Sequence, residues 1–132
     1  MRWPGPGAPP WRGRSMRMAR SRPGSRRRVA LLVEASRAYA RGLIRGVARY
    51  NRERGGWQIQ FTPRGLEAPP PAWLDAWEGE GLLARIDDRR TADAVARKRV
   101  PVVELRRLLP GLPFPSIGPD DAAVSRLVFD HF

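Results

Sequence analysis

The stretch Val29-Ala-Leu-Leu-Val-Glu-Ala35 is a short apolar run broken by a single acid, the pattern of a β-strand buried on both faces of a sheet. A helix over 37–54 is predicted directly after it, because Ser36 suits an N-cap. Apolar residues then follow at helical spacing, namely Ala40, Leu43, Ile44, Val47 and Tyr50. A buried strand followed at once by an amphipathic helix is the first half of a βαβ unit.

The rest of the chain continues this alternation. Further strands are predicted at 57–62, 81–86, 100–105 and 115–118, and further helices begin at Pro71, Arg89 and Asp120. Strands that alternate with helices at short spacing form right-handed βαβ units and a mostly parallel sheet. The predicted fold class is therefore α/β, a doubly wound layer around a mostly parallel sheet.

The start of the chain differs in composition from the rest. Residues 1–28 hold nine Arg, five Pro and no acid, so the net charge of +12 divides into +9 there and +3 over 29–132. We expect residues 1–27 to form a disordered basic tail, because this composition buries too little apolar surface to offset the entropy of ordering.

Two interpretations of this tail stay open. It is either a basic arm that contacts nucleic acid without base preference, or the product of a start codon assigned too far upstream. In the second case Met16 or Met18 is the true start. Under the first interpretation the residues nearest the folded part that contact nucleic acid are Arg26, Arg27 and Arg28.

Composition excludes several classes of site. The chain has no Cys and a single His, His131, which removes disulfides, thiolate nucleophiles, cysteine zinc sites and multi-histidine metal sites. Neither G-x-G-x-x-G nor a P-loop follows the first strand, so we expect no cofactor. No catalytic residue and no metal ligand is predicted. Without an apolar run of membrane-spanning length or a secretory core, we expect a cytoplasmic protein with no membrane partner.

A polar rim is expected where the strands end, because ligands of such sheets bind beyond the carboxyl ends of the strands. Carboxylates and guanidinium groups together suit a polyhydroxylated ligand. For Asp87 and Asp120 the alternative is helix capping alone. Arg85 is either a ligand group or, by preference, an edge residue whose head reaches water. The rim comprises Glu34 to Arg37, Arg64, Asp87 to Arg90, Arg106, Asp120 and Asp121.

The ordered set of these pieces resembles a known family, the xylose operon regulators. The resemblance covers about residues 27–132. That family in turn resembles the LacI/GalR sugar-binding domain, a two-lobed periplasmic-binding-protein fold, joined in this case to a C-terminal AraC-type DNA-binding domain. The segments that carry the resemblance are 27–36, 39–50, 81–88, 100–103 and 118–121.

The resemblance implies the N-terminal part of a sugar-responsive, xylose-like transcription regulator. Residues 28–132 are then a partial sugar-sensing lobe, the incomplete first lobe of a type I periplasmic-binding-protein-like fold. A truncated gene, a frameshift or a contig end would each produce such a chain. The implied partners are a monosaccharide effector, DNA through a domain absent from this chain, and a second copy when the protein is complete. Gly42 and Gly46 lie at the implied dimer surface, and the expected ligand-binding residues are Ser36, Arg37, Asp87, Asp88 and Asp120.

The alternative from another class is a small flavodoxin-like α/β enzyme that uses the acidic pair Asp87 and Asp88 with a divalent metal. An acidic pair at a strand end fits it. However, the sole lysine, Lys98, falls inside a predicted helix and no phosphate loop is present, so the regulator is preferred.

Overall fold

The computed structural model of the chain describes residues 24–131. Residues 1–23, which make up most of the predicted basic tail, lie outside the described part. The first strand begins at Arg27.

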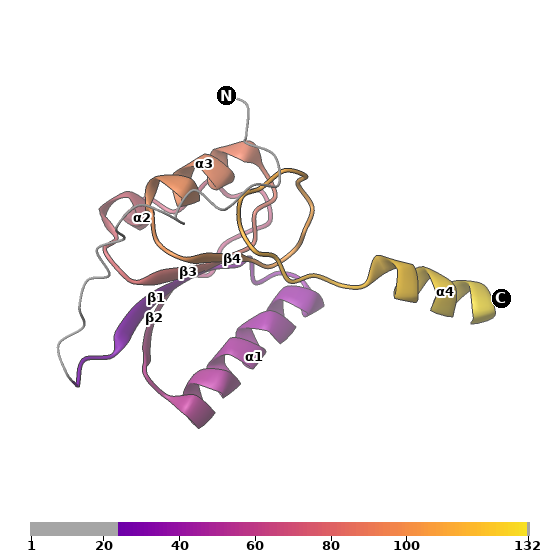
Figure 1. Cartoon of the computed structure of the whole chain (residues 1–132), viewed down its shortest axis with the longest axis horizontal. Helices are drawn as coiled ribbons and strands as arrows, with labels where there is room; N and C mark the ends of the chain where they lie inside the picture. The colour runs from indigo at the N-terminus through magenta and orange to yellow at the C-terminus, as the bar shows by residue number, and fades with distance from the viewer. Residues whose placement is uncertain (1–23, 132) are drawn as a thin grey trace.

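One parallel sheet forms the centre of the described chain (Figure 1). Its strands are β1 (Arg27–Leu32), β2 (Trp57–Phe61), β3 (Gly81–Ala84) and β4 (Val102–Glu104), and their order across the sheet is β2-β1-β3-β4. Every pair of neighbours is parallel, which confirms the predicted fold class.

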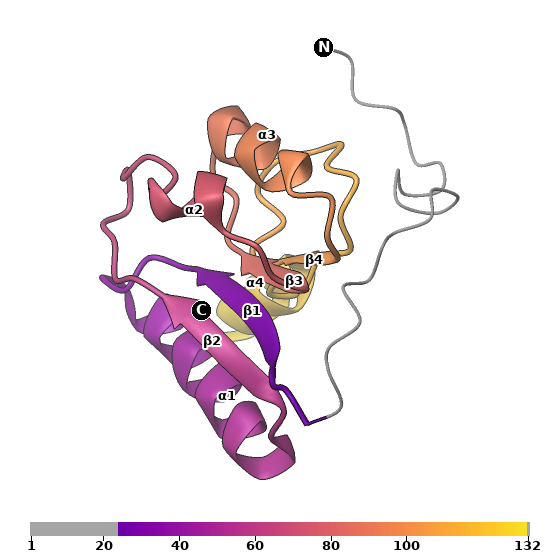
Figure 2. The ribbon, with the colours of Figure 1, turned by 90° about the vertical axis from the view of Figure 1, so that its left-hand side faces the viewer.

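Helices cover both faces of the sheet (Figure 2). Alternate strand residues such as Leu32 and Leu82 face a core shared with α2 (Trp73–Ala76) and α3 (Arg89–Arg97). Their neighbours Leu31 and Leu83 face α1 (Ala38–Arg54) on the other side. This alternation explains why the strands are apolar runs in the sequence, because both faces of each strand meet apolar side chains.

Two local predictions are wrong. The segment 115–118 is not a strand: it makes one isolated bridge, between Glu104 and Ser116, held by two backbone hydrogen bonds of Glu104. Ser36 does not cap α1 either. The N-cap position is held by Arg37, whose side chain makes no capping hydrogen bond. The Ser36 hydroxyl does not cap the helix, because it donates to the Glu34 carboxylate.

The last helix, α4 (Asp121–His131), stands away from the sheet in Figure 1. None of its residues is buried. Among residues 24–131, no helix combines the length and the apolar character needed to cross a membrane.

Candidate functional site

Charged side chains gather where the parallel strands end. The register places Leu32 beside Ala84 and Ala84 beside Glu104, so the residues that follow these positions reach the same edge of the sheet. Ion pairs and hydrogen bonds connect the members of this group, which we term the strand-end cluster: Glu34, Arg85, Asp87, Glu104 and Arg106.

The innermost part of the cluster is a buried ion pair between Glu34 and Arg85. Arg85 Nη1 lies 2.8 Å from Glu34 Oε1, and the two side chains are only 3% and 2% exposed. The preferred prediction, that the head of Arg85 reaches water, is therefore wrong. The Glu34 carboxylate, 51 residues earlier in sequence and just past the end of β1, holds it inside, and a partner of opposite charge is what a buried guanidinium requires.

Asp87 extends the cluster from the interior toward the surface. Arg85 Nε lies 2.9 Å from Asp87 Oδ2 and 3.2 Å from Oδ1, and Arg106 Nε lies 3.5 Å from Oδ1. The Asp87 side chain is 23% exposed. Because a carboxylate has about four lone-pair sites, Asp87 can accept further hydrogen bonds on its open side while two guanidinium groups hold it in place.

The second oxygen of Glu34 organises the turn that follows β1. Glu34 Oε2 accepts hydrogen bonds from the Ser36 N–H at 2.6 Å, from the Ser36 hydroxyl and from the Arg37 N–H at 3.2 Å. Burial acts to raise the pKa of Glu34, but these hydrogen bonds and the charge of Arg85 outweigh it, so the pKa is lowered. The Ser36–Arg37 turn is thus fixed at the rim, with both residues exposed.

The two adjacent acids, Asp87 and Asp88, bind different partners. Asp88 caps α3: its Oδ1 accepts from the Thr91 N–H at 2.7 Å, and its Oδ2 accepts from the Thr91 hydroxyl at 3.0 Å. Asp87 points instead to Arg85. Asp120 likewise acts as a cap, accepting from the Ala123 N–H at 2.9 Å at the start of α4, and the structure does not bring it into the strand-end cluster. Within residues 24–131 no group of three metal-ligating side chains is found.

Glu104 was not among the predicted site residues, although its carboxylate joins several backbone groups at this edge of the sheet. It is 1% exposed, and its carboxylate accepts from the backbone N–H groups of Ile86 at 3.4 Å, Arg106 at 2.9 Å and Arg107 at 2.6 Å. Arg107 has a φ of 63°, a conformation that costs a non-glycine residue energy, and the bond to Glu104 holds it there. The signal was present in the sequence as a single acid within an apolar strand.

Arg64 lies in the loop after β2 and reaches the same edge. Its carbonyl accepts from the Ala35 N–H at 3.2 Å. The pKa of its guanidinium is lowered, mainly because the group is buried. The nearby charges of Asp87 and Asp88 act to raise this pKa, and the charge of Arg85 acts to lower it. These electrostatic interactions with Asp87, Asp88 and Arg85 are consistent with the prediction that Arg64 belongs to the polar rim.

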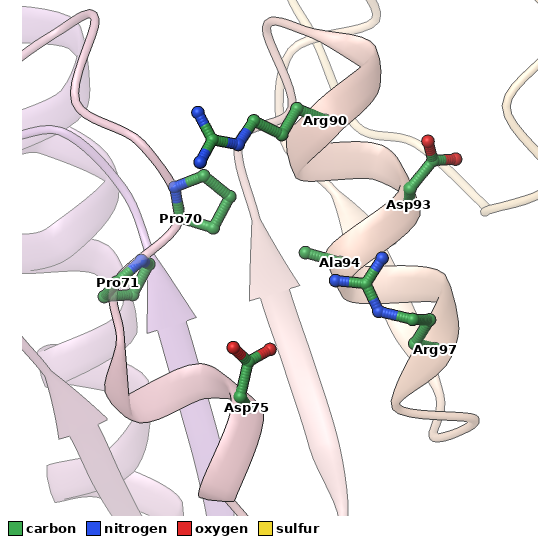
Figure 3. A pocket seen from close by; sticks show the side chains of 7 residues that line it. All are labelled: Pro70, Pro71, Asp75, Arg90, Asp93, Ala94 and Arg97. Atoms are coloured by element: carbon green, nitrogen blue, oxygen red, sulfur yellow. The ribbon is translucent and has the colours of Figure 1, made fainter.

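A separate pocket of about 490 Å³ lies between α2 and α3 (Figure 3). Asp75 comes from α2, and α3 contributes Arg90, Asp93 and Arg97. The polar rim was predicted to include Arg90, and the structure places it here instead. The pocket contains no member of the strand-end cluster. Because ligands of open α/β sheets bind at the carboxyl ends of the strands, the cluster and not this pocket is the candidate site.

The residues predicted for other surfaces are exposed. Gly42 and Gly46 on α1 face open space, because a Cβ atom on either would have no neighbour within 4 Å. Arg26, Arg27 and Arg28 are exposed where β1 begins, at the opposite end of the strand from the cluster.

Comparison with known proteins identifies the family to which the chain belongs. The family model described as the XylR N-terminal domain matches residues 28–107, a range that contains all of β1 except Arg27, the strands β2 to β4 and the whole strand-end cluster. The chain belongs to the XylR N-terminal domain family. The predicted resemblance to the xylose operon regulators is thereby confirmed.

Relatives and a solved structure agree with this assignment. The xylose operon regulatory protein of Escherichia coli K12 is 34% identical over 79 residues, which cover 59% of this chain and 20% of that protein. The same protein of Escherichia coli O157:H7 matches equally well. A solved structure described as the xylose-binding transcription activator xylR has 27% identity and a TM-score of 0.63, and covers 82% of this chain and 27% of its own. The chain thus spans about a fifth of the length of the curated relatives it matches.

Proposed function

We propose that this chain supplies one half of a sugar-binding cleft in a transcription regulator, and that Asp87 is its principal ligand contact. The observation that carries the proposal is the partly open Asp87 carboxylate, held by Arg85 and Arg106 at the carboxyl end of β3. The matched regulators are named for xylose, which makes a pentose the favoured effector class.

The chemistry of the cluster suits vicinal hydroxyl groups. A carboxylate accepts hydrogen bonds from two neighbouring hydroxyls, and a guanidinium group such as that of Arg106 or the exposed Arg37 donates to a third. Hydrogen bonds to charged groups are stronger than neutral ones. The buried Glu34–Arg85 pair positions Asp87 and the Ser36–Arg37 turn before a ligand arrives, so little ordering is needed on binding.

The partners of the complete protein follow from this role. We infer that closure of the cleft by a monosaccharide repositions DNA-binding modules that lie outside this chain, within a homodimer in the cytoplasm. The exposed Gly42 and Gly46 leave a surface on α1 where a second helix can approach closely. The named relatives are regulators, and Asp87 and Asp88 point to different partners, so neither observation supports the flavodoxin-like enzyme.

A chimera tests the role of Asp87. Residues 28–107 of this chain replace their counterparts in the Escherichia coli xylose operon regulatory protein, and pentose binding is measured by calorimetry. Asp87→Asn should weaken binding by about 1.5–3 kcal/mol, the range for a hydrogen bond to a charged group. Asp88→Asn is the matched control, because an asparagine oxygen still caps α3. Equal affinity of the Asp87→Asn and parent chimeras would contradict the proposal.

We further propose that the arginines at the start of β1 contact nucleic acid without base preference. Arg26, Arg27 and Arg28 are exposed, and the one acidic contact given for them is to the backbone, where the Arg28 N–H donates to the Glu80 carboxylate at 3.0 Å. Binding of the 132-residue chain to unrelated DNA duplexes should be equal among sequences and should fall steeply with salt, because it depends on counterion release. Selective binding of one sequence at physiological salt would refute this role.

A further inference from the structure

The exposed side of α1 is strongly basic. The helix holds five Arg and a single acid, Glu53. Four of the arginines follow one another at intervals of four, four and three residues, and all four are exposed: Arg41, Arg45, Arg49 and Arg52. Residues at this spacing lie on one side of an α-helix, so they form a row about 16 Å long at a rise of about 1.5 Å per residue. We call these four residues the arginine row.

The positive charge of the row is largely left open. Within the part of the chain that the structure describes, Arg45 and Arg52 take part in no ion pair. Arg41 Nη1 donates to a neutral backbone carbonyl at 2.6 Å, and Arg49 pairs with Glu53 where both side chains are exposed. Like charges one turn apart on a helix repel each other and lower its stability. A polyanion bound along the row would remove this repulsion.

The row lacks the large apolar side chains that other macromolecular partners require. On the same side of α1 it is interspersed only with Ala38 and Ala48. A protein interface has an apolar core, and a helix that lies on a membrane inserts large apolar side chains. A nucleic-acid backbone needs neither, because its phosphates are bound through charge. The composition of the row therefore favours nucleic acid over a membrane or a protein.

The row leads toward the arginines at the start of β1. The Arg27 N–H donates to the Gly56 carbonyl at 2.7 Å, and Gly56 comes two residues after α1 ends at Arg54. Figure 2 shows the end of α1 and the start of β1 at the same end of the sheet. Arg52, at the end of the row, and residues 26–28 are therefore placed to contact one continuous polyanion.

We propose that the arginine row binds the phosphate backbone of DNA and extends the contact made by residues 26–28. This inference rests on the proposed function, which puts the chain in a regulator beside DNA, but it does not depend on sugar binding. Gly42 follows Arg41 by one residue, and one residue turns an α-helix by about 100°. The row therefore lies on a different side of α1 from the surface proposed for pairing. Because the row meets phosphates and not bases, it adds affinity without base preference.

Fluorescence anisotropy of a labelled DNA duplex, titrated with the 132-residue chain at several salt concentrations, tests the row. The double variant Arg45→Ala/Arg52→Ala should reduce the slope of log K against log salt by about 1.8, because each lost phosphate contact removes about 0.9. Arg90→Ala/Arg97→Ala is the matched control. It makes the same change of charge in α3, on the other face of the sheet, and should leave the slope unchanged. Arg45→Lys/Arg52→Lys retains both charges and should keep the parent slope.

Thermal unfolding separates binding from folding. Arg45→Ala/Arg52→Ala removes like-charged neighbours along the helix, so it should unfold at a temperature no lower than the parent chain. An unfolding temperature below that of the parent would contradict the repulsion within the row. An unchanged slope in this variant, an equal loss of slope in the α3 control, or binding of the chain to phosphatidylserine vesicles but not to DNA would each overturn the inference.

Replacing residues 26–28 with Ala tests the proposed contact at β1 separately. The slope should fall in this variant as well, and by more than in Arg45→Ala/Arg52→Ala, because three charges are removed. A slope that falls on replacement of residues 26–28 but not in the α1 variant contradicts the arginine row alone. A parent chain that does not bind DNA contradicts both.

Discussion

Replacing Arg85 with Ala should lower the free energy of unfolding by about 3–5 kcal/mol, because it leaves the Glu34 carboxylate buried without its cation. Urea unfolding followed by circular dichroism measures the loss. Arg49→Ala is the matched control: Arg49 pairs with Glu53 at the same 2.8 Å, but the side chains are 73% and 54% exposed, so its removal should cost about 0.3–0.5 kcal/mol.

The same variant should change the response to acid. In the parent chain the pKa of Glu34 is lowered from its ordinary value of 4.5, so its stabilisation is present above that pH and is lost as the pH falls through the folded-state pKa. Without Arg85 the folded-state pKa rises, and acid unfolding should begin at a higher pH. A loss of stability no larger than that of Arg49→Ala, with an unchanged acid transition, would show that the buried pair contributes nothing.

Glu104→Ala should have the second-largest effect, a loss of about 2–4 kcal/mol. It removes the acceptor of three backbone N–H groups, and each buried donor left without a partner costs about 1–3 kcal/mol. Glu104→Gln retains one acceptor oxygen and should lose less. Hydrogen exchange gives a local readout, because the amides of Ile86, Arg106 and Arg107 should exchange faster in Glu104→Ala. Unchanged exchange at all three would rule out this role of Glu104.

The parallel layer was predictable because both its strands and its helices leave periodic signals. Val29 to Ala35 is an apolar run, and the α1 residues follow at helical spacing, so local pattern and tertiary environment agree. The segment 115–118 was predicted as a strand because it continues the alternation of strands and helices, although its Pro and Gly are residues that strands disfavour, and only Ser116 forms a bridge. A single bridge leaves no signature that distinguishes it from a short strand.

The site was predictable in location but not in its internal connections. The rule that ligands bind at carboxyl strand ends placed Glu34, Arg64, Asp87 and Arg106 at one edge. It did not reveal that Arg85 turns inward, because its partner Glu34 follows a different strand, and which strands lie side by side is not visible in a single sequence. Ser36 was expected to cap a helix, but its hydroxyl instead donates to the carboxylate of Glu34, two residues earlier.

Calorimetric titration of xylose into the chimera that carries residues 28–107 tests the central claim most directly. If residues 28–107 of this chain form half of a sugar cleft, the chimera binds xylose and the 132-residue chain alone gives no heat, because one half of the cleft leaves each hydroxyl open to competition from water. A folded chimera that does not bind xylose, or tight binding by the 132-residue chain alone, would contradict the account.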